Sequence, residues 1–311
     1  MISVAIKIGH INDLDKFDME SWQEKIIDDY DKVNDRNRKE FLRYFLMSDV
    51  ERIYFGSEFC QNMIPSLKEV EYALEYAEKH NLKLSLLTPI VTDAGVEKLI
   101  NIFTCFKDSN VIDEIIFNDW GVYYLINKMN IKYKYVCGRL LDKTQRDPRI
   151  SDEGYQDFFS DEGLKYLQTP ALMSKAFGKI LKDGKVERVE IDCYPQGLNV
   201  PDKENDSFHL SMWYPYGYVT TGRMCLFNMM DKDESHKFDL RNGCKRNCLK
   251  YTRILYKREG TYSSIMPLGA YDVTLYNKGN TVFYSSNDLA NLLNSKNNLI
   301  DRLVFQPYLC V

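Results

Sequence analysis

Four of the eight cysteines occupy positions that suit a metal site: Cys60, Cys225, Cys244 and Cys248. Thiolate is a soft ligand that suits zinc and iron–sulfur clusters, and four thiolates complete either site. The segment Cys244-Lys-Arg-Asn-Cys248 places two sulfurs four residues apart, so both reach one face of a helix or one cavity beside a loop. Its basic residues favour a lowered thiol pKa. Two interpretations stay open, a metal site and buried cysteines that pack as small hydrophobic residues.

Composition limits what the rest of the chain does. The 311 residues are 44% hydrophobic and 28% charged, as in ordinary globular proteins, and the length permits one large α/β barrel or two smaller domains. The net charge of -4 gives no global case for nucleic-acid binding, although small basic patches exist. No signal-peptide core and no bilayer-spanning apolar run occur. Eight cysteines without an export signal therefore indicate reduced thiols in the cytoplasm.

Strand and helix patterns alternate along the first half of the chain, which is typical of βαβ units and a parallel sheet. The predicted strands there are 2–8, 50–55, 83–90, 113–117 and 133–137, and the predicted helices are 22–45, 66–80, 93–106 and 121–129. The second half predicts helices at 174–181 and 286–293, an extended segment at 208–218, and strands at 188–193, 251–256, 269–276, 281–284 and 302–305. No repeat or linker divides the chain, so we expect one α/β domain over 1–311, with an irregular cysteine-bearing loop at 231–247. The glycine-rich loop motifs that bind dinucleotides and nucleoside triphosphates are both absent from the sequence.

An ordered set of fragments resembles the peptidase U32 family, and within it the iron–sulfur members that act in oxygen-independent (anaerobic) ubiquinone hydroxylation. The fragments are Ile53-Tyr-Phe-Gly-Ser-Glu-Phe-Cys60, Ile115-Ile-Phe-Asn-Asp-Trp-Gly121, Val189-Glu-Ile-Asp192, Thr220-Thr-Gly-Arg-Met-Cys225, Cys244-x-x-x-Cys248 and the closing segment Ile300 to Pro307. The resemblance implies a (β/α) barrel-like fold, similar to a TIM barrel, with a [4Fe–4S] cluster at one mouth. It also implies that the cluster ligands are Cys60, Cys225, Cys244 and Cys248.

Two functions follow from the resemblance. The first is an oxygen-independent hydroxylase, or a subunit of one, that acts on an aromatic ring or a nucleobase, with prephenate as the anionic oxygen donor. The second is a non-catalytic subunit whose cluster carries electrons or supports the fold, while a paralogous U32-family partner holds the substrate. Proteolysis is the least supported function, because neither a Gly-x-Ser-x-Gly elbow nor a His-Glu-x-x-His motif occurs. The charged spacer at 231–236 differs from the ubiquinone-linked members, so we expect a different substrate.

In a barrel of this kind, active residues gather at the carboxyl ends of the strands. The candidates for catalysis are Asp119, Asp192 and Arg223, and the candidates for substrate binding are Asn118, Arg139 and Arg146. Arginine binds carboxylate or phosphate through two parallel hydrogen bonds.

Each candidate also has a simpler explanation. Asn118 and Asp119 could cap the helix predicted near Gly121, and Arg146 could belong to a solvated loop. The aromatic segment 213–218 could wall a pocket for a ring-shaped substrate or pack in the core.

Overall fold

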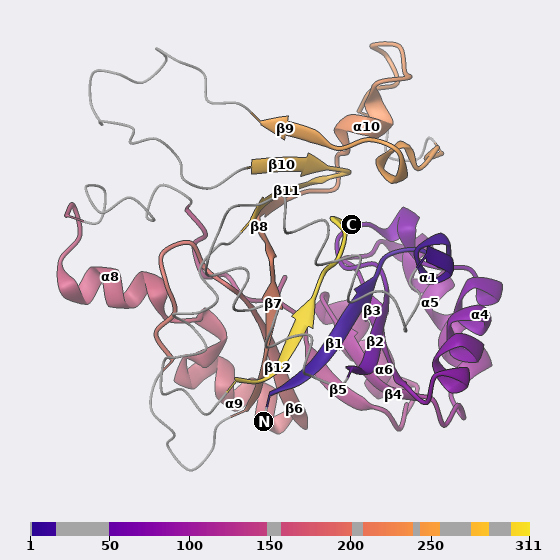
Figure 1. The fold of residues 1–311 in the computed structure, drawn as a ribbon, viewed down its shortest axis with the longest axis horizontal. Coiled ribbons are helices and arrows are strands. Elements are labelled where there is room, and N and C mark those ends of the chain that lie inside the picture. Colours follow the sequence, from indigo (N-terminus) through magenta and orange to yellow (C-terminus); the bar gives the residue numbers. More distant parts are fainter. Residues whose placement is uncertain are drawn as a thin grey trace.

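The computed structural model describes residues 2–16, 50–147, 157–200, 208–238, 243–255, 275–285 and 300–311. Eight parallel strands close into a barrel in the order β1-β12-β7-β6-β5-β4-β3-β2. A four-stranded antiparallel sheet in the order β8-β11-β10-β9, which we call the cap, lies over the end toward which the barrel strands run (Figure 1). The predicted α/β barrel architecture is therefore confirmed.

The element bounds agree with most of the predicted ones. The barrel strands are β1 (Ser3–Ile8), β2 (Val50–Gly56), β3 (Lys83–Thr88), β4 (Ile112–Phe117), β5 (Lys134–Cys137), β6 (Val186–Asp192), β7 (His209–Tyr214) and β12 (Ile300–Phe305). The cap strands are β8 (Tyr216–Thr221), β9 (Arg253–Leu255), β10 (Leu275–Lys278) and β11 (Thr281–Ser285). The helices are α1 (Ile11–Lys16), α4 (Leu67–Lys79), α5 (Asp93–Phe106), α6 (Trp120–Lys128), α8 (Asp161–Gln168), α9 (Lys175–Asp183) and α10 (Leu226–Met229), with short 3-10 turns η1 (Gln61–Met63), η3 (Ala171–Met173) and η4 (Asn247–Leu249). The predicted helices at 22–45 and 286–293 lie outside the described residues.

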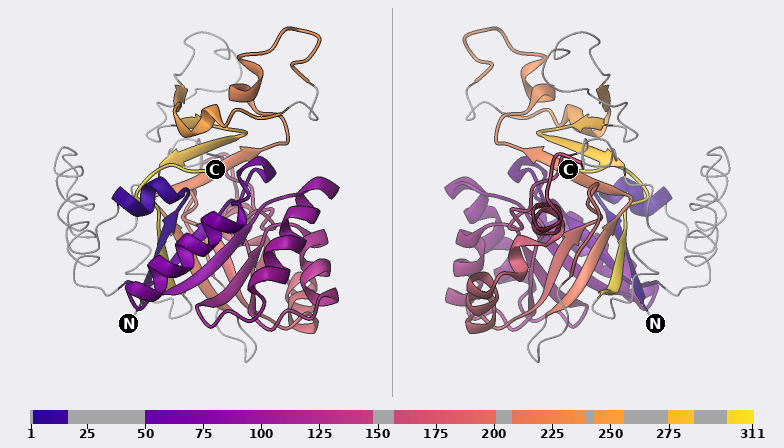
Figure 2. Two further views of the ribbon diagram at one scale, coloured as in Figure 1. Left: turned by 90° about the vertical axis from the view of Figure 1, so that its right-hand side faces the viewer. Right: turned by 90° about the vertical axis from the view of Figure 1, so that its left-hand side faces the viewer.

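The cap strands lie between two barrel strands in the sequence, yet the barrel itself is continuous in space. The chain leaves the barrel after β7, builds β8 to β11, and returns as β12. Strand β12 pairs in parallel with β7 on one side and with β1 on the other, with Val304 opposite both Trp213 and Ala5. Figure 2 shows the cap above the barrel from two sides. The last strand thus closes a barrel that the first seven leave open.

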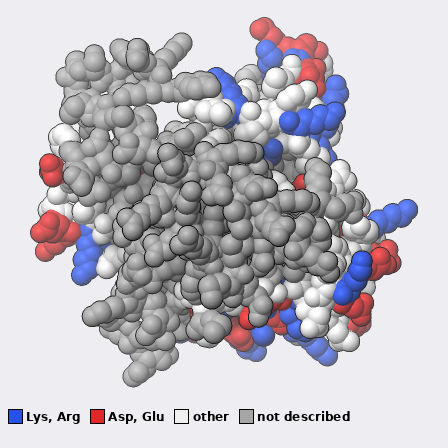
Figure 3. All heavy atoms as spheres, viewed as in Figure 1, with Lys and Arg blue, Asp and Glu red and all other residues white. Residues whose placement is uncertain are grey.

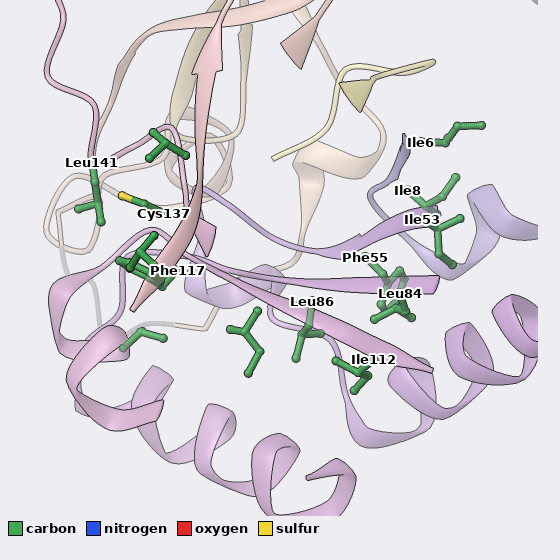
Figure 4. Packing of buried hydrophobic residues seen from close by; sticks show 14 of the residues in the cluster. Ile6, Ile8, Ile53, Phe55, Leu84, Leu86, Ile112, Phe117, Cys137 and Leu141 are labelled. Atoms are coloured by element: carbon green, nitrogen blue, oxygen red, sulfur yellow. The ribbon is translucent and has the colours of Figure 1, made fainter. Parts of the chain in front are cut away.

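Apolar side chains fill the space between the barrel and its helices. Ile53, Phe55, Leu84 and Leu86 from β2 and β3 belong to this outer cluster (Figure 4). Helix α4 begins with a capping box, in which Ser66 and the residue three positions later satisfy each other's backbone N–H groups. Among the described residues, no helix is long and apolar enough to cross a membrane.

The inside of the barrel is partly polar. An apolar cluster at mid-height consists of Ala5, Tyr54, Leu87, Ile116, Val136, Trp213 and Val304. Near the strand starts, Glu114 accepts two hydrogen bonds from Arg302, at 2.8 and 3.0 Å, and pairs with Arg52 at 3.0 Å. Each buried charge here has a partner of opposite sign, as burial requires.

Glu190 is a fully buried carboxyl group in β6, and the indole N–H of Trp213 donates to its Oε2 at 3.0 Å. Burial, followed by the nearby Glu58 carboxylate, raises the pKa of Glu190 from 4.5 to about 8. Between these values the folded chain keeps a proton that the unfolded chain has lost. The contribution of Glu190 to stability is therefore full below about pH 4.5 and is lost as the pH rises through about 8.

Replacing Glu190 with Gln removes this titration and should flatten the pH dependence of stability. From about pH 5 to about pH 8, we expect the unfolding free energy of the unmodified protein to fall by about 1 kcal/mol per pH unit relative to Glu190→Gln. Urea unfolding at a series of pH values measures the difference. Glu187→Gln, at an exposed position on the same strand, serves as control and should keep the original slope. Identical slopes for Glu190→Gln and the unmodified protein would contradict this account.

Candidate metal centre

The four predicted ligand cysteines line one pocket beside the cap. Cys60 immediately precedes η1, Cys225 precedes α10, and Cys248 lies in η4 with Cys244 four residues before it. Segments that are far apart in the sequence thus bring four sulfur atoms to the wall of one pocket. The other lining residues are Asn62, Met63, Arg223, Met224, Asn228, Met229, Lys237, Gly279 and Val311.

The end of β2 turns sharply to present Cys60. Gly56 has a φ of +118°, and a Cβ there would lie 2.4 Å from the carbonyl oxygen of Leu87, so only glycine fits. The Ser57 hydroxyl then holds the Cys60 backbone, accepting from its N–H at 3.2 Å and donating to its carbonyl at 3.0 Å. The Asn280 side chain in the cap donates to the Phe59 carbonyl at 2.7 Å. The Cys60 segment is therefore fixed to both the barrel and the cap.

Two residues between Cys244 and Cys248 tie the cysteine segments together. Arg246 adopts a left-handed conformation and donates its Nε to the Asn62 carbonyl, in the Cys60 segment, at 3.0 Å. Asn247 donates to the carbonyl of Phe227, in α10, at 3.1 Å. The polar residues of this motif thus hold the loop against the other two cysteine-bearing segments.

The thiols are harder to ionise than their basic neighbours suggest. Burial raises the pKa of Cys60 to about 11 and that of Cys248 to about 12, and it also raises the pKa of Cys225. The other pocket cysteines add to each increase, which reflects their closeness. The expectation that the basic residues of the Cys244–Cys248 segment lower the thiol pKa is therefore wrong for Cys248, because burial outweighs the cations. A metal group that binds here displaces the protons, so its binding weakens as the pH falls.

The four thiols are soft donors that suit either a zinc ion or an iron–sulfur cluster. Within the described ranges, no three His, Cys, Asp or Glu side chains are placed so as to hold a metal ion. A zinc ion, with Zn–S bonds of about 2.3 Å, draws four sulfurs tightly around one point. An iron–sulfur cluster is a larger body with a separate iron for each thiolate, so its ligands stand farther apart. The donor chemistry admits both groups.

Arg139 forms a second polar centre, buried beneath the cap and separate from the residues that line the cysteine pocket. Its Nε and Nη2 donate to the two carboxylate oxygens of Glu58, both at 2.9 Å. Its Nη1 donates to Asp192 at 2.7 Å and to the Tyr216 carbonyl at 2.8 Å. The guanidinium carbon lies 4.0 Å from the ring centre of Trp213. These four hydrogen bonds occupy most of the N–H donors of the guanidinium group.

Arg146 extends the same network. It donates from Nε to the second oxygen of Asp192 at 2.6 Å and from Nη2 to Asp142 at 3.2 Å. Its guanidinium carbon lies 4.1 Å from the ring centre of Tyr218, whose hydroxyl donates to the Arg139 carbonyl at 3.1 Å. Arg146 is only 6% exposed, so the interpretation as a solvated loop residue is wrong.

The structure brings three predicted site residues together, Arg139, Arg146 and Asp192. Both arginine charges are already paired, because Arg139 also binds Glu58 and Arg146 also binds Asp142. An anionic substrate at either arginine would have to compete with Asp192, which accepts from both. Substrate binding by Arg139 and Arg146, and catalysis by Asp192, stay predictions. Arg223 is exposed and lines the cysteine pocket, and no ion pair joins it to another described residue.

Asn118 and Asp119 have structural contacts. Asp119 caps α6, accepting from the Gly121 N–H at 2.6 Å, and it also accepts from the Val91 N–H at 3.2 Å. The capping alternative is therefore confirmed for Asp119, while its catalytic role stays a prediction. Asn118 is buried, donating to the Thr88 carbonyl at 3.1 Å and accepting from the Leu140 N–H at 3.1 Å.

The aromatic segment 213–218 packs in the core. Trp213, Tyr214 and Tyr218 are all buried, which supports the core interpretation over an open pocket wall. Cys137 and Cys193 are also buried.

Sequence reasoning missed two residues. Lys237 lines the cysteine pocket, but it directly follows the charged spacer at 231–236, so its sequence context does not distinguish it from solvated lysines. Glu58 pairs with Arg139, and its only signal is its place two positions before Cys60 in a family-like fragment.

No protein-family model and no curated protein matches this chain. The function is therefore inferred from the cysteine pocket and from the sequence fragments that contain its four cysteines.

Removing the Arg139 charge leaves buried Glu58 without its cation and takes one of two arginines away from Asp192. We expect Arg139→Met to lower the unfolding free energy by about 3–5 kcal/mol. Lys134→Met, which breaks a 3.4 Å pair at a side chain that is 53% exposed, should cost less than about 1 kcal/mol. Urea unfolding of both variants gives the comparison, and Glu58→Gln replaces Arg139→Met if the latter does not fold. Equal losses for the buried and exposed variants would contradict a central role for Arg139.

Proposed function

We propose that this chain is an iron–sulfur protein of the peptidase U32 type, in which Cys60, Cys225, Cys244 and Cys248 hold a [4Fe–4S] cluster. Its function is to support oxygen-independent hydroxylation of an aromatic or nucleobase substrate. The observation that carries the proposal is the shared pocket: the four cysteines chosen from ordered sequence fragments all line it. The other four cysteines are absent from that lining.

The residues around the thiols suit a negatively charged group. A [4Fe–4S] cluster supplies one-electron redox chemistry or, at an iron that exchanges a ligand, Lewis acidity. Arg223 and Lys237 in the pocket wall balance the charge of the thiolates, and they also suit the carboxylates of an anionic ligand such as prephenate. Asn62 and Asn228 add amide groups to the wall that can orient such a ligand.

A second candidate function is a cluster-bearing subunit without catalytic residues of its own. One observation favours it: Asp119 caps a helix and Asp192 is enclosed by two arginines, so neither carboxylate lines the cysteine pocket. In this case a paralogous partner subunit supplies the substrate site. Both candidates require the cluster, so the cluster is the first point to test.

Replacing the ligand cysteines tests the cluster. We expect the Cys244→Ala/Cys248→Ala double variant, purified without oxygen, to fall from about four iron atoms per chain to less than one, because two of four thiolates are lost. Cys105→Ala, at an exposed position on α5, is the matched control and should load fully. Iron and sulfide assays, with circular dichroism to verify folding, provide the readout. Full iron loading in a folded double variant would contradict the assignment of Cys244 and Cys248 as cluster ligands.

A further inference from the structure

Exposed apolar side chains lie on the chain segments next to Cys225 and Cys248, two of the pocket cysteines. They lie on α10, η4 and β9 and on the residues beside these elements. Each is 37–65% exposed, and they are Met224, Leu226, Met230, Leu249, Tyr251 and Ile254. Helix α10 and turn η4 lie side by side, held by the bond from Asn247 to the Phe227 carbonyl. We call these six side chains, with the basic residues described next, the pocket rim.

The pocket rim is positively charged although the chain as a whole carries -4. The described stretch 243–255 contains four Lys or Arg and no Asp or Glu. Two of these, Lys250 and Arg253, form no ion pair with another described residue, and Arg223 and Lys237 add charge from the pocket wall. Figure 3 shows Lys and Arg side chains gathered on the cap, with acidic ones at its outer end.

This combination of side chains indicates the chemistry of the partner. Methionine, leucine, isoleucine and tyrosine together gain free energy by burial against another apolar surface, which a phosphate backbone does not offer. Methionine, aromatic and arginine side chains are enriched at protein interfaces. The positive rim selects an acidic protein and repels a second copy's equivalent rim. A nucleic acid fits less well, because the chain is acidic overall.

The size and place of the rim indicate the type of protein. Six apolar side chains make a small patch, and small interfaces are typical of transient encounters between redox proteins. Opposite charges accelerate such encounters and make them sensitive to salt. Three rim residues, Arg223, Met224 and Lys237, line the cysteine pocket itself, so a partner that covers the rim lies next to the pocket.

We propose that the pocket rim is the docking surface for a small acidic one-electron carrier of the ferredoxin or flavodoxin class. The partner class depends on the proposed cluster: one electron passes between the carrier and the cluster, with no bond made or broken and no proton transferred. Binding itself depends only on the rim, so the two proposals can fail separately.

The test uses the full chain purified without oxygen, with its iron content measured on the same sample. Binding to a reduced acidic [2Fe–2S] ferredoxin and to a flavodoxin is measured by calorimetry and by NMR line broadening, at low and at high salt. The variant Lys250→Glu/Arg253→Glu reverses two rim charges. The control Lys98→Glu/Lys128→Glu reverses two exposed charges on α5 and α6, which are barrel helices.

We expect salt-sensitive binding that weakens by about tenfold or more in the rim variant and changes by less than about twofold in the control. Absence of binding by both carriers to iron-loaded protein would overturn the proposal, as would equal weakening in the two variants. Binding of a mixed-sequence RNA oligonucleotide in place of the carriers, lost in the rim variant, would also overturn it. Low iron content with intact rim-dependent docking would contradict the cluster and leave the docking surface standing.

Discussion

The guanidinium group of Arg139 is the contact on which the arrangement of the molecule depends. At one buried point it binds Glu58 from the segment after β2, Asp192 at the end of β6, and the carbonyl of Tyr216 in the cap. Because Glu58 stands two residues before Cys60, the same contact that fixes the cap also fixes the position of one thiol. The geometry of the candidate metal centre therefore rests on a charge network that is not part of the centre.

Buried charges occur at both ends of the barrel interior, with an apolar cluster between them. Glu114 and its two arginines lie near the strand starts, and the Arg139 network lies at the strand ends. A buried ion pair adds little net stability over a well-packed apolar group, but removing one partner is costly. Such pairs therefore disfavour alternative arrangements of strands and cap more than they raise overall stability.

The barrel strands could be predicted from sequence, because local patterns carry them. Strand β3 is a short apolar run between two amphipathic helices, and Cys244 and Cys248 form one motif. Grouping Cys60 with the later cysteines depends mainly on the family resemblance, since it lies far upstream of them. The role of Arg139 could not be predicted, because its partner Glu58 is 81 residues away. The last strand could be predicted, but its pairing with β7 could not, since the cap separates the two strands in the sequence. Lys237 has no local signal because it directly follows a charged segment.

The most direct test of the central claim is metal and sulfide analysis of the unmodified chain purified without oxygen, with absorbance spectra before and after dithionite. The account predicts about four iron and four sulfide per chain, bound by the four pocket cysteines, with visible absorbance that bleaches on reduction. Zinc without sulfide would contradict it. The pocket would then be a structural zinc site, and both the hydroxylation proposal and the electron-carrier partner would lose their basis.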